Sequence, residues 1–175
     1  MQPFNYDLKQ HVRTIADFPE KGTLYYDVSP LLADGGAWHD AIARLSDKIL
    51  SFNPEILVGI EPHGYLLSAP LAYRMACGFV RVRKTGKVLG GVVGTVPGST
   101  RSLKYDLGEV TIQTELLKPG QRAVILDDIL ATGQTAAATA QLLRQVGCEV
   151  VGAAFLIEMK GKSRLDIPYC SLMTY

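Results

Sequence analysis

Short apolar runs alternate along this chain with longer runs whose apolar residues recur at helical spacing, a pattern typical of α/β proteins. Apolar runs at Glu55–Ile60, Gly78–Val82 and Ala123–Leu126 predict buried parallel strands. Apolar residues at helical spacing predict helices over Trp38–Phe52 and Tyr65–Ala76. The remaining elements that we predict are helices over Asn5–Ile15 and Ala136–Val146 and strands over Gly108–Gln113, Glu149–Ile157 and Pro168–Tyr175. We therefore expect an α/β fold with a mainly parallel central sheet flanked by helices.

The most informative stretch runs from Ala123 to Thr135. Its apolar strand is followed by the adjacent acids Asp127 and Asp128, then by small and hydroxyl residues, and then by a helix. Backbone N–H groups at a helix start suit a phosphate, and the threonine hydroxyls add donors. The two carboxylates would repel a phosphate and are better acceptors for the two hydroxyls of a ribose. The stretch therefore predicts a site for a sugar phosphate.

Two common nucleotide motifs do not describe this stretch. It lacks the glycine, lysine and hydroxyl spacing of a Walker loop. It has one glycine, and its acids precede the turn, so it is not the dinucleotide fingerprint either. It resembles the phosphoribosyl-pyrophosphate (PRPP) signature of the type I phosphoribosyltransferases. That resemblance implies that Asp127 and Asp128 hold the ribose, and that the 5′-phosphate is bound by Ala131, Thr132, Gly133, Gln134 and Thr135.

Composition narrows the class of protein. A chain of 175 residues has the length of one domain, so we expect a single domain over 1–175. A net charge of +1 gives no electrostatic reason to expect nucleic-acid or membrane partners, and no apolar run reaches the roughly 18 residues that span a bilayer. The first residues carry no signal-peptide core, and the three cysteines lie far apart in apolar contexts. We therefore predict a cytoplasmic protein.

A basic run follows the strand that ends at Val82. Arg83, Lys84 and Lys87 lie within five residues around a glycine, as a polyanion requires. The family has a similar run here, so the resemblance implies that these cations bind pyrophosphate. A second loop at the same edge contains His63, where the family usually has arginine. This histidine could still donate to a phosphate, although its side chain is shorter and only partly charged near neutral pH.

The N-terminal segment is a proline- and glycine-containing loop over residues 17–30. It resembles the hood of adenine phosphoribosyltransferases, which closes over the purine, and we assign the hood to residues 1–35. The resemblance implies that Tyr25 stacks on the base, with Leu24 and Tyr26 beside it. Tyr26 stands where the family usually has arginine, and simple core packing is the other interpretation of Tyr25. Met159 occupies the position of an apolar base contact.

Residues 88–107 form a long glycine-containing segment, which we predict to be a mobile lid loop over the active site. The corresponding segment of the family ends in a glutamate near the base, and here Lys104 takes its place. We include Lys104 with Asp127 and Asp128 among the catalytic candidates. Asp106 or Glu109 could supply the missing carboxylate, or Lys104 could face a 6-oxo group or pyrophosphate.

The resemblance spans nearly the whole chain and implies a type I phosphoribosyltransferase. The implied reaction is adenine plus PRPP giving AMP and pyrophosphate. It implies Mg²⁺ as cofactor, bound through PRPP and water, and a homodimer. Two alternatives stay open at this point: an enzyme for hypoxanthine, guanine or xanthine, and a regulator that binds PRPP without turnover.

Overall fold

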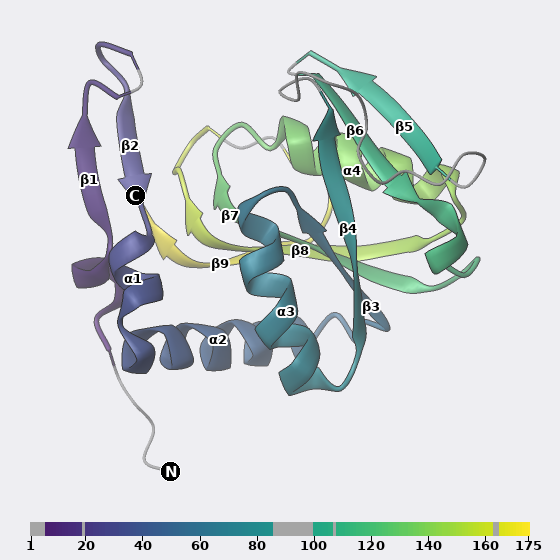
Figure 1. Cartoon of the computed structure of the whole chain (residues 1–175), viewed down its shortest axis with the longest axis horizontal. Coiled ribbons are helices and arrows are strands. Elements are labelled where there is room, and N and C mark those ends of the chain that lie inside the picture. Colours follow the sequence, from purple (N-terminus) through teal and green to yellow (C-terminus); the bar gives the residue numbers. More distant parts are fainter. Residues whose placement is uncertain (1–5, 19, 86–99, 107, 163–164) are drawn as a thin grey trace. The chain divides into compact units, whose positions relative to one another are not determined.

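The computed structural model describes residues 6–18, 20–85, 100–106, 108–162 and 165–175. The chain divides into two compact units, Met1–Arg44 and Leu45–Tyr175. The boundary falls within helix α2 (Gly35–Leu50), so the N-terminal unit is longer than the predicted hood segment 1–35. Figure 1 shows the helices and strands of both units.

The N-terminal unit begins with a short 3₁₀ turn, η1 (Leu8–His11), followed by strand β1 (Arg13–Ala16). The predicted helix over Asn5–Ile15 is therefore wrong. The Asp7 side chain caps the turn by accepting from the Lys9 N–H group at 3.2 Å, and the residues after it pair antiparallel with β2 (Leu24–Asp27). Tertiary pairing overrides the local helical spacing. The predicted loop over residues 17–30 also contains β2 and the start of helix α1 (Ser29–Ala33).

Asp27, the last residue of β2, accepts hydrogen bonds from β1 and from the start of α1. Its carboxylate accepts from the Ser29 N–H group at 2.9 Å and from Arg13 Nε at 3.0 Å. The hydrogen bonds from Ser29, and then the one from Arg13, lower the pKa of this carboxyl to about 2. The ionised form of Asp27 therefore stabilises the β1–β2 ribbon.

The C-terminal unit is built on a seven-stranded sheet with the order β5-β6-β4-β3-β7-β8-β9 (Figure 1). Strands β4, β3, β7, β8 and β9 are parallel, and β6 pairs antiparallel with β4 and β5. The prediction of a mainly parallel sheet in an α/β fold is confirmed. The elements are β3 (Ile56–Ile60), α3 (His63–Met75), β4 (Gly78–Thr85), β5 (Thr100–Tyr105), β6 (Gly108–Gln113), η2 (Thr114–Leu116), β7 (Arg122–Leu130), α4 (Gln134–Gln145), β8 (Glu149–Glu158) and β9 (Tyr169–Thr174).

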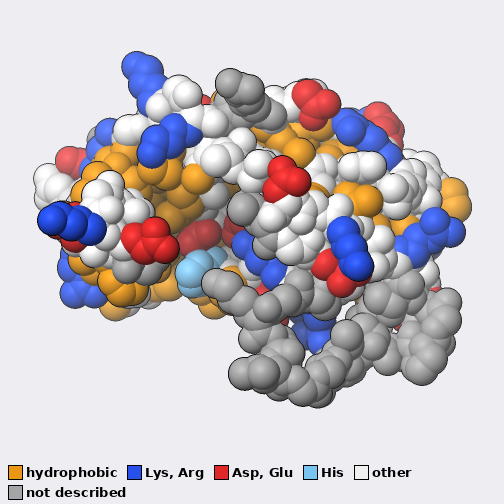
Figure 2. Space-filling model, turned by 90° about the horizontal axis from the view of Figure 1, so that it is seen from above, with side chains coloured by type: hydrophobic (Ala, Val, Ile, Leu, Met, Phe, Trp, Pro, Cys, Tyr) orange, Lys and Arg blue, Asp and Glu red, His pale blue; other side chains and the backbone are white. Residues whose placement is uncertain are grey.

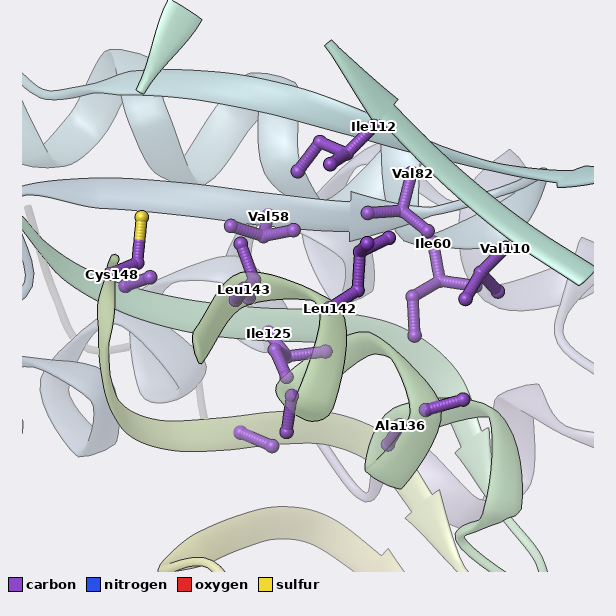
Figure 3. Packing of buried hydrophobic residues seen from close by; sticks show 14 of the residues in the cluster. Val58, Ile60, Val82, Val110, Ile112, Ile125, Ala136, Leu142, Leu143 and Cys148 are labelled. Carbon is purple, nitrogen blue, oxygen red and sulfur yellow. The ribbon is translucent and has the colours of Figure 1, made fainter. Parts of the chain in front are cut away.

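Helices α3 and α4 pack against opposite faces of this sheet. On one face Val58 and Ile125 pack with Leu142 and Leu143 of α4 in one buried apolar cluster (Figure 3). Gly59, the next residue of β3, points to the other face, where an added Cβ would meet the Ser68 hydroxyl of α3. Strand alternation therefore assigns each residue at the end of a strand to the α3 side or the α4 side.

Several strands are longer than the sequence predicts. Strand β4 continues through Arg83 and Lys84 to Thr85, and β7 continues through both acids to Leu130. Part of the predicted lid loop, Thr100–Tyr105, is strand β5 instead, because it pairs along its whole length with β6. Residues 88–99 and 107 of that prediction lie outside the described residues. Among the helices of the described ranges, none is both long and apolar enough to span a membrane.

Candidate functional site

The site begins where β7 extends beyond its neighbour β3. Strand β7 pairs with β3 only as far as Leu126, opposite Gly59, but it pairs with β8 as far as Leu130. Asp127 and Asp128 therefore lie at the carboxyl edge, with a strand on one side only. Ligands of open parallel sheets bind at this edge. The sequence predicted a strand that ends in the two carboxylates, whereas β7 continues past both acids to Leu130.

Alternation along β7 sends the two carboxylates to opposite faces. Ile125 packs with α4, so Asp127, two residues further on, faces the α4 side, and Asp128 faces the α3 side. A pocket of about 200 Å³ on this edge is lined by residues 127–136 together with Lys84 and Phe155. The predicted ribose-phosphate residues are thus brought together around one pocket.

Asp128 is held by an ion pair with His63, the first residue of α3. The His63 Nδ1 atom lies 2.7 Å from Asp128 Oδ2, and the Ile129 N–H group donates to Asp128 Oδ1 at 2.9 Å. The hydrogen bond to Asp128 raises the pKa of His63 above its ordinary value, and the charges of Asp128 and Asp127 act in the same direction. Figure 2 shows acidic, basic and histidine side chains gathered on the face seen from above.

Glycines bring the His63 turn onto β7. A Cβ on Gly64 would lie 2.3 Å from the Leu126 carbonyl oxygen, so only glycine permits this approach. The Ser68 hydroxyl donates to the Gly64 carbonyl at 2.7 Å and holds the turn from the other side. The glycine after His63 therefore sets the distance from the imidazole to Asp128.

Asp127 is in a different electrostatic environment. Its burial raises the pKa of this carboxyl above the ordinary range, and the charge of Asp128 adds to the rise. Lys84 opposes the shift, and the Asp128 N–H group donates to Asp127 Oδ1 at 3.1 Å. Burial therefore favours the protonated form of Asp127.

The turn from Ala131 to Gly133 leads into α4 at Gln134. Gly133, with φ of +83°, is the N-cap, a left-handed conformation that glycine adopts readily. The Thr132 hydroxyl accepts from the Gln134 N–H group at 3.4 Å. Because the first N–H groups of a helix have no acceptor within it, they are available to an anion. This geometry suits the predicted phosphate site.

The predicted pyrophosphate cations lie on two faces of β4. Lys84 lines the pocket with Asp127, opposite Val110 of β6. Arg83, its neighbour in the extended strand, points to the other face. Tyr65 lies near that face: Arg81 lies 6.0 Å from its ring centre, and burial, with the nearby charge of Glu61, raises the pKa of Tyr65 to about 12. Lys87 lies outside the described residues, so its role stays a prediction.

Lys104 lies on β5 directly opposite Glu109 of β6 and is exposed. Alternation sends its side chain to the face opposite Tyr105, whose ring packs against the α4 cluster. Asp106 lines a second pocket of about 240 Å³, beside Gln134. Asp106 and Glu109, the two candidates to replace the missing lid glutamate, therefore lie near the end of the β5–β6 hairpin. Which of them acts stays a prediction.

The predicted base contacts come from both units. Leu24, Tyr25 and Tyr26 lie in β2 of the N-terminal unit, where alternation puts Tyr25 on one face and the other two on the opposite face. A flat base can stack on only one of these two faces. The arrangement in which Tyr25 stacks on the base, with Leu24 and Tyr26 beside it, therefore stays a prediction. In the C-terminal unit the Met159 N–H group donates to the Leu130 carbonyl at 2.9 Å, which fixes Met159 at the end of β7.

Residues that were not among the predicted ones also contribute contacts at the site. The Glu61 carboxylate accepts from the Lys84 N–H group at 3.1 Å, which joins the His63 loop to the basic strand. The Tyr105 hydroxyl lies 3.2 Å from Thr135 Oγ1, at the phosphate turn. Phe155 lines the pocket from β8. Only Glu61 had a signal in the sequence, an acid immediately after an apolar strand.

Comparison with known proteins supports one family. The sequence pattern described as "Phosphoribosyl transferase domain" matches residues 32–173. A protein of Gluconobacter oxydans named adenine phosphoribosyltransferase is 51% identical over 97% of this chain and 94% of its own length. The crystal structure of adenine phosphoribosyltransferase from Thermoanaerobacter pseudethanolicus has a TM-score of 0.83 at 34% identity, covering 97% of this chain and 98% of the other. An adenine phosphoribosyltransferase from Saccharomyces cerevisiae, solved in complex with adenine, gives a TM-score of 0.77 at 29% identity, covering 95% of this chain and 96% of the other.

Proposed function

Because this chain belongs to the phosphoribosyltransferase family, we propose that it converts adenine and PRPP into AMP and pyrophosphate. The observation that carries the proposal is the pocket formed by the paired acids, the turn before α4 and Lys84. A strand end with carboxylates, next to the N-terminus of a helix, offers separate partners for a ribose and its phosphate. The curated relatives add the base, adenine.

The chemistry is a displacement at the anomeric carbon of the ribose. The bond from this carbon to the pyrophosphate oxygen breaks, the oxygen keeps the electron pair, and N9 of adenine forms the new bond and loses its proton. Positive charge develops on the sugar as pyrophosphate leaves. The enzyme must therefore hold both reactants in line and stabilise opposite charges at neighbouring places.

The residues divide these tasks in our proposal. Asp127 and Asp128 accept from the ribose hydroxyls, and their negative charge lies close to the developing cation. Residues 131–135 bind the 5′-phosphate through N–H groups and threonine hydroxyls. Lys84 meets the pyrophosphate from the α4 side of β4, with Arg83 and Lys87 as further cations. Tyr25 and Met159 are the proposed stacking partners of the base.

Magnesium is the cofactor that the family implies. Among the residues that the structure describes, no three His, Cys, Asp or Glu side chains form a group that could hold a metal ion. We propose an ion that arrives with PRPP and keeps phosphate and water oxygens as its ligands. Residues 131–135 and Lys84 hold such an ion only indirectly, through PRPP. When bound, Mg²⁺ neutralises charge on the leaving pyrophosphate.

The test is pyrophosphate release with PRPP, Mg²⁺ and one base at a time: adenine, hypoxanthine, guanine or xanthine. We expect turnover with adenine alone. Turnover with a 6-oxopurine instead would assign the enzyme to another base and implicate Lys104 and Tyr26. No pyrophosphate release with any of the four bases, together with measurable PRPP binding, would favour a regulator that binds PRPP without turnover.

We also propose that the protein is a homodimer in the cytoplasm, as the sequence predicts. Helix α3 carries an exposed row that a second copy could cover, with Leu66 46% and Tyr73 91% exposed. Light scattering on the wild type and on Tyr73→Glu tests this surface. A wild type that elutes as a monomer at working concentrations would contradict the dimer.

A further inference from the structure

The chemistry above does not use the contact between His63 and Asp128. The His63 side chain is 42% exposed and the Asp128 side chain 14%, so the imidazole shields the carboxylate from solvent. One Asp128 oxygen accepts from the backbone at 2.9 Å and the other meets His63 Nδ1 at 2.7 Å. The orientation of this carboxylate is therefore set from both sides before any ligand binds.

We propose that His63 is a positioning residue, which as an imidazolium holds Asp128 for the ribose hydroxyls and makes PRPP affinity fall as the pH rises. This inference rests on the proposed function, because it requires that Asp128 binds the ribose of PRPP. It assigns His63 a role through Asp128, in addition to any direct contact with pyrophosphate. A histidine can lose its charge near neutral pH, which an arginine cannot do.

The charged groups facing His63 determine the direction of the effect. Asp128 and Asp127 both favour the imidazolium, and Lys84 opposes it. Whether or not Asp127 is ionised, the four side chains carry one positive charge more while His63 is protonated than after it loses the proton. The polyanion PRPP is attracted less by the second state. Because the pKa of His63 is raised, the favourable state persists above the ordinary histidine range and is lost as the pH rises through the raised value.

Asp127 acts in the same direction, so the pH profile of the wild type alone cannot identify the group responsible. Its raised pKa means that it also gains negative charge as the pH rises. Substitution at His63 separates the two groups. His63→Arg keeps a positive charge throughout, and His63→Gln keeps an N–H donor without charge. The other two histidines of the chain, His11 and His39, lie in the N-terminal unit, and His39→Gln serves as the matched control.

The experiment is the dissociation constant of PRPP with Mg²⁺, by calorimetry, from about pH 6 to about pH 9, across the range where histidine titrates. At the acidic end we expect the wild type to match His63→Arg and to bind about tenfold more tightly than His63→Gln, the difference between a charged and a neutral hydrogen bond. At the alkaline end we expect the wild type to fall to the affinity of His63→Gln. His39→Gln should follow the wild type throughout, and thermal unfolding confirms that each variant is folded.

Parallel profiles for the wild type, His63→Arg and His63→Gln would overturn the inference, because the slope would then come from Asp127 or from PRPP itself. Binding is read without turnover, so the two proposals fail separately. If the wild type binds PRPP and consumes adenine but the three profiles are parallel, only the proposed role of His63 is refuted. If the wild type does not bind PRPP, both the proposed function and the inference that rests on it are refuted.

Discussion

The close approach of the β3–α3 turn to β7 leads to a sharp prediction for Gly64→Ala. The added methyl carbon would lie 2.3 Å from the Leu126 carbonyl oxygen and 3.1 Å from the Gly59 carbonyl carbon. The first distance is about 1 Å shorter than an ordinary contact of 3.4–4 Å, and both neighbours are backbone atoms that cannot rotate away. The turn must therefore move as a whole.

That movement has two measurable costs. Overpacking of this kind lowers the free energy of unfolding by about 1–3 kcal/mol, and we expect the upper half of the range because no side chain can absorb the strain. A shift of about 1 Å would also stretch the contact between His63 and Asp128 from 2.7 Å beyond hydrogen-bond length. The pKa of His63 should then return toward its ordinary value.

Urea unfolding gives the free energy, and NMR titration of the imidazole protons gives the pKa of His63. The control is Gly35→Ala at the start of α2, where an added Cβ meets nothing within 4 Å and the backbone is not left-handed. We expect this control to be neutral or slightly stabilising. A Gly64→Ala protein within about 0.5 kcal/mol of the wild type, the usual range for harmless surface changes, and with an unchanged His63 pKa would refute the packing argument.

Three further substitutions test separate contacts. Asp128→Asn should weaken PRPP binding at least about tenfold in calorimetry, because it removes a charged partner of the ribose and of His63, and unchanged affinity would contradict the assignment. Tyr105→Phe removes the hydroxyl that lies 3.2 Å from Thr135 Oγ1, so we expect PRPP to bind up to about fivefold more tightly, whereas weaker binding would mean that this hydroxyl contacts the phosphate itself. Asp27→Asn should lower stability at neutral pH and flatten the acid-unfolding curve. The native carboxylate, with a pKa of about 2, stabilises the fold above its ordinary pKa and loses that effect as the pH falls toward 2, so an unchanged acid curve would count against it.

The sheet and its ligand edge could be predicted because buried parallel strands consist of contiguous apolar residues. The apolar runs that form β3 and β8 are examples. The PRPP motif is likewise one uninterrupted stretch, which runs through β7 to the start of α4. The ends of β4 and β7 could not be predicted in the same way. Arg83 and Asp127 are polar and resemble the end of a strand, yet pairing with β6 and β8 continues through them. A local pattern does not reveal how far a neighbouring strand extends.

The contact between His63 and Asp128 could not be predicted either, for a different reason. The two residues are far apart in the sequence, and their distance depends on Gly64 and on the register between β3 and β7. The sequence placed both at one edge of the sheet, which is correct, but it suggested phosphate as the partner of His63. A histidine offers the same N–H donors to a phosphate and to a carboxylate, so residue type alone does not choose between them.

The alternation of β7 has a consequence for how this motif tolerates substitution over evolutionary time. Asp127 faces a pocket where burial favours its protonated form, and asparagine reproduces the shape and the donor of that form. Asp128 contacts His63 as an ion-pair partner, and asparagine cannot carry the negative charge of that pair. The two adjacent aspartates are therefore not duplicates of each other. An amide at the first position would keep the local shape but lose the negative charge that the proposed reaction uses, whereas a change at the second would also require a matching change at position 63.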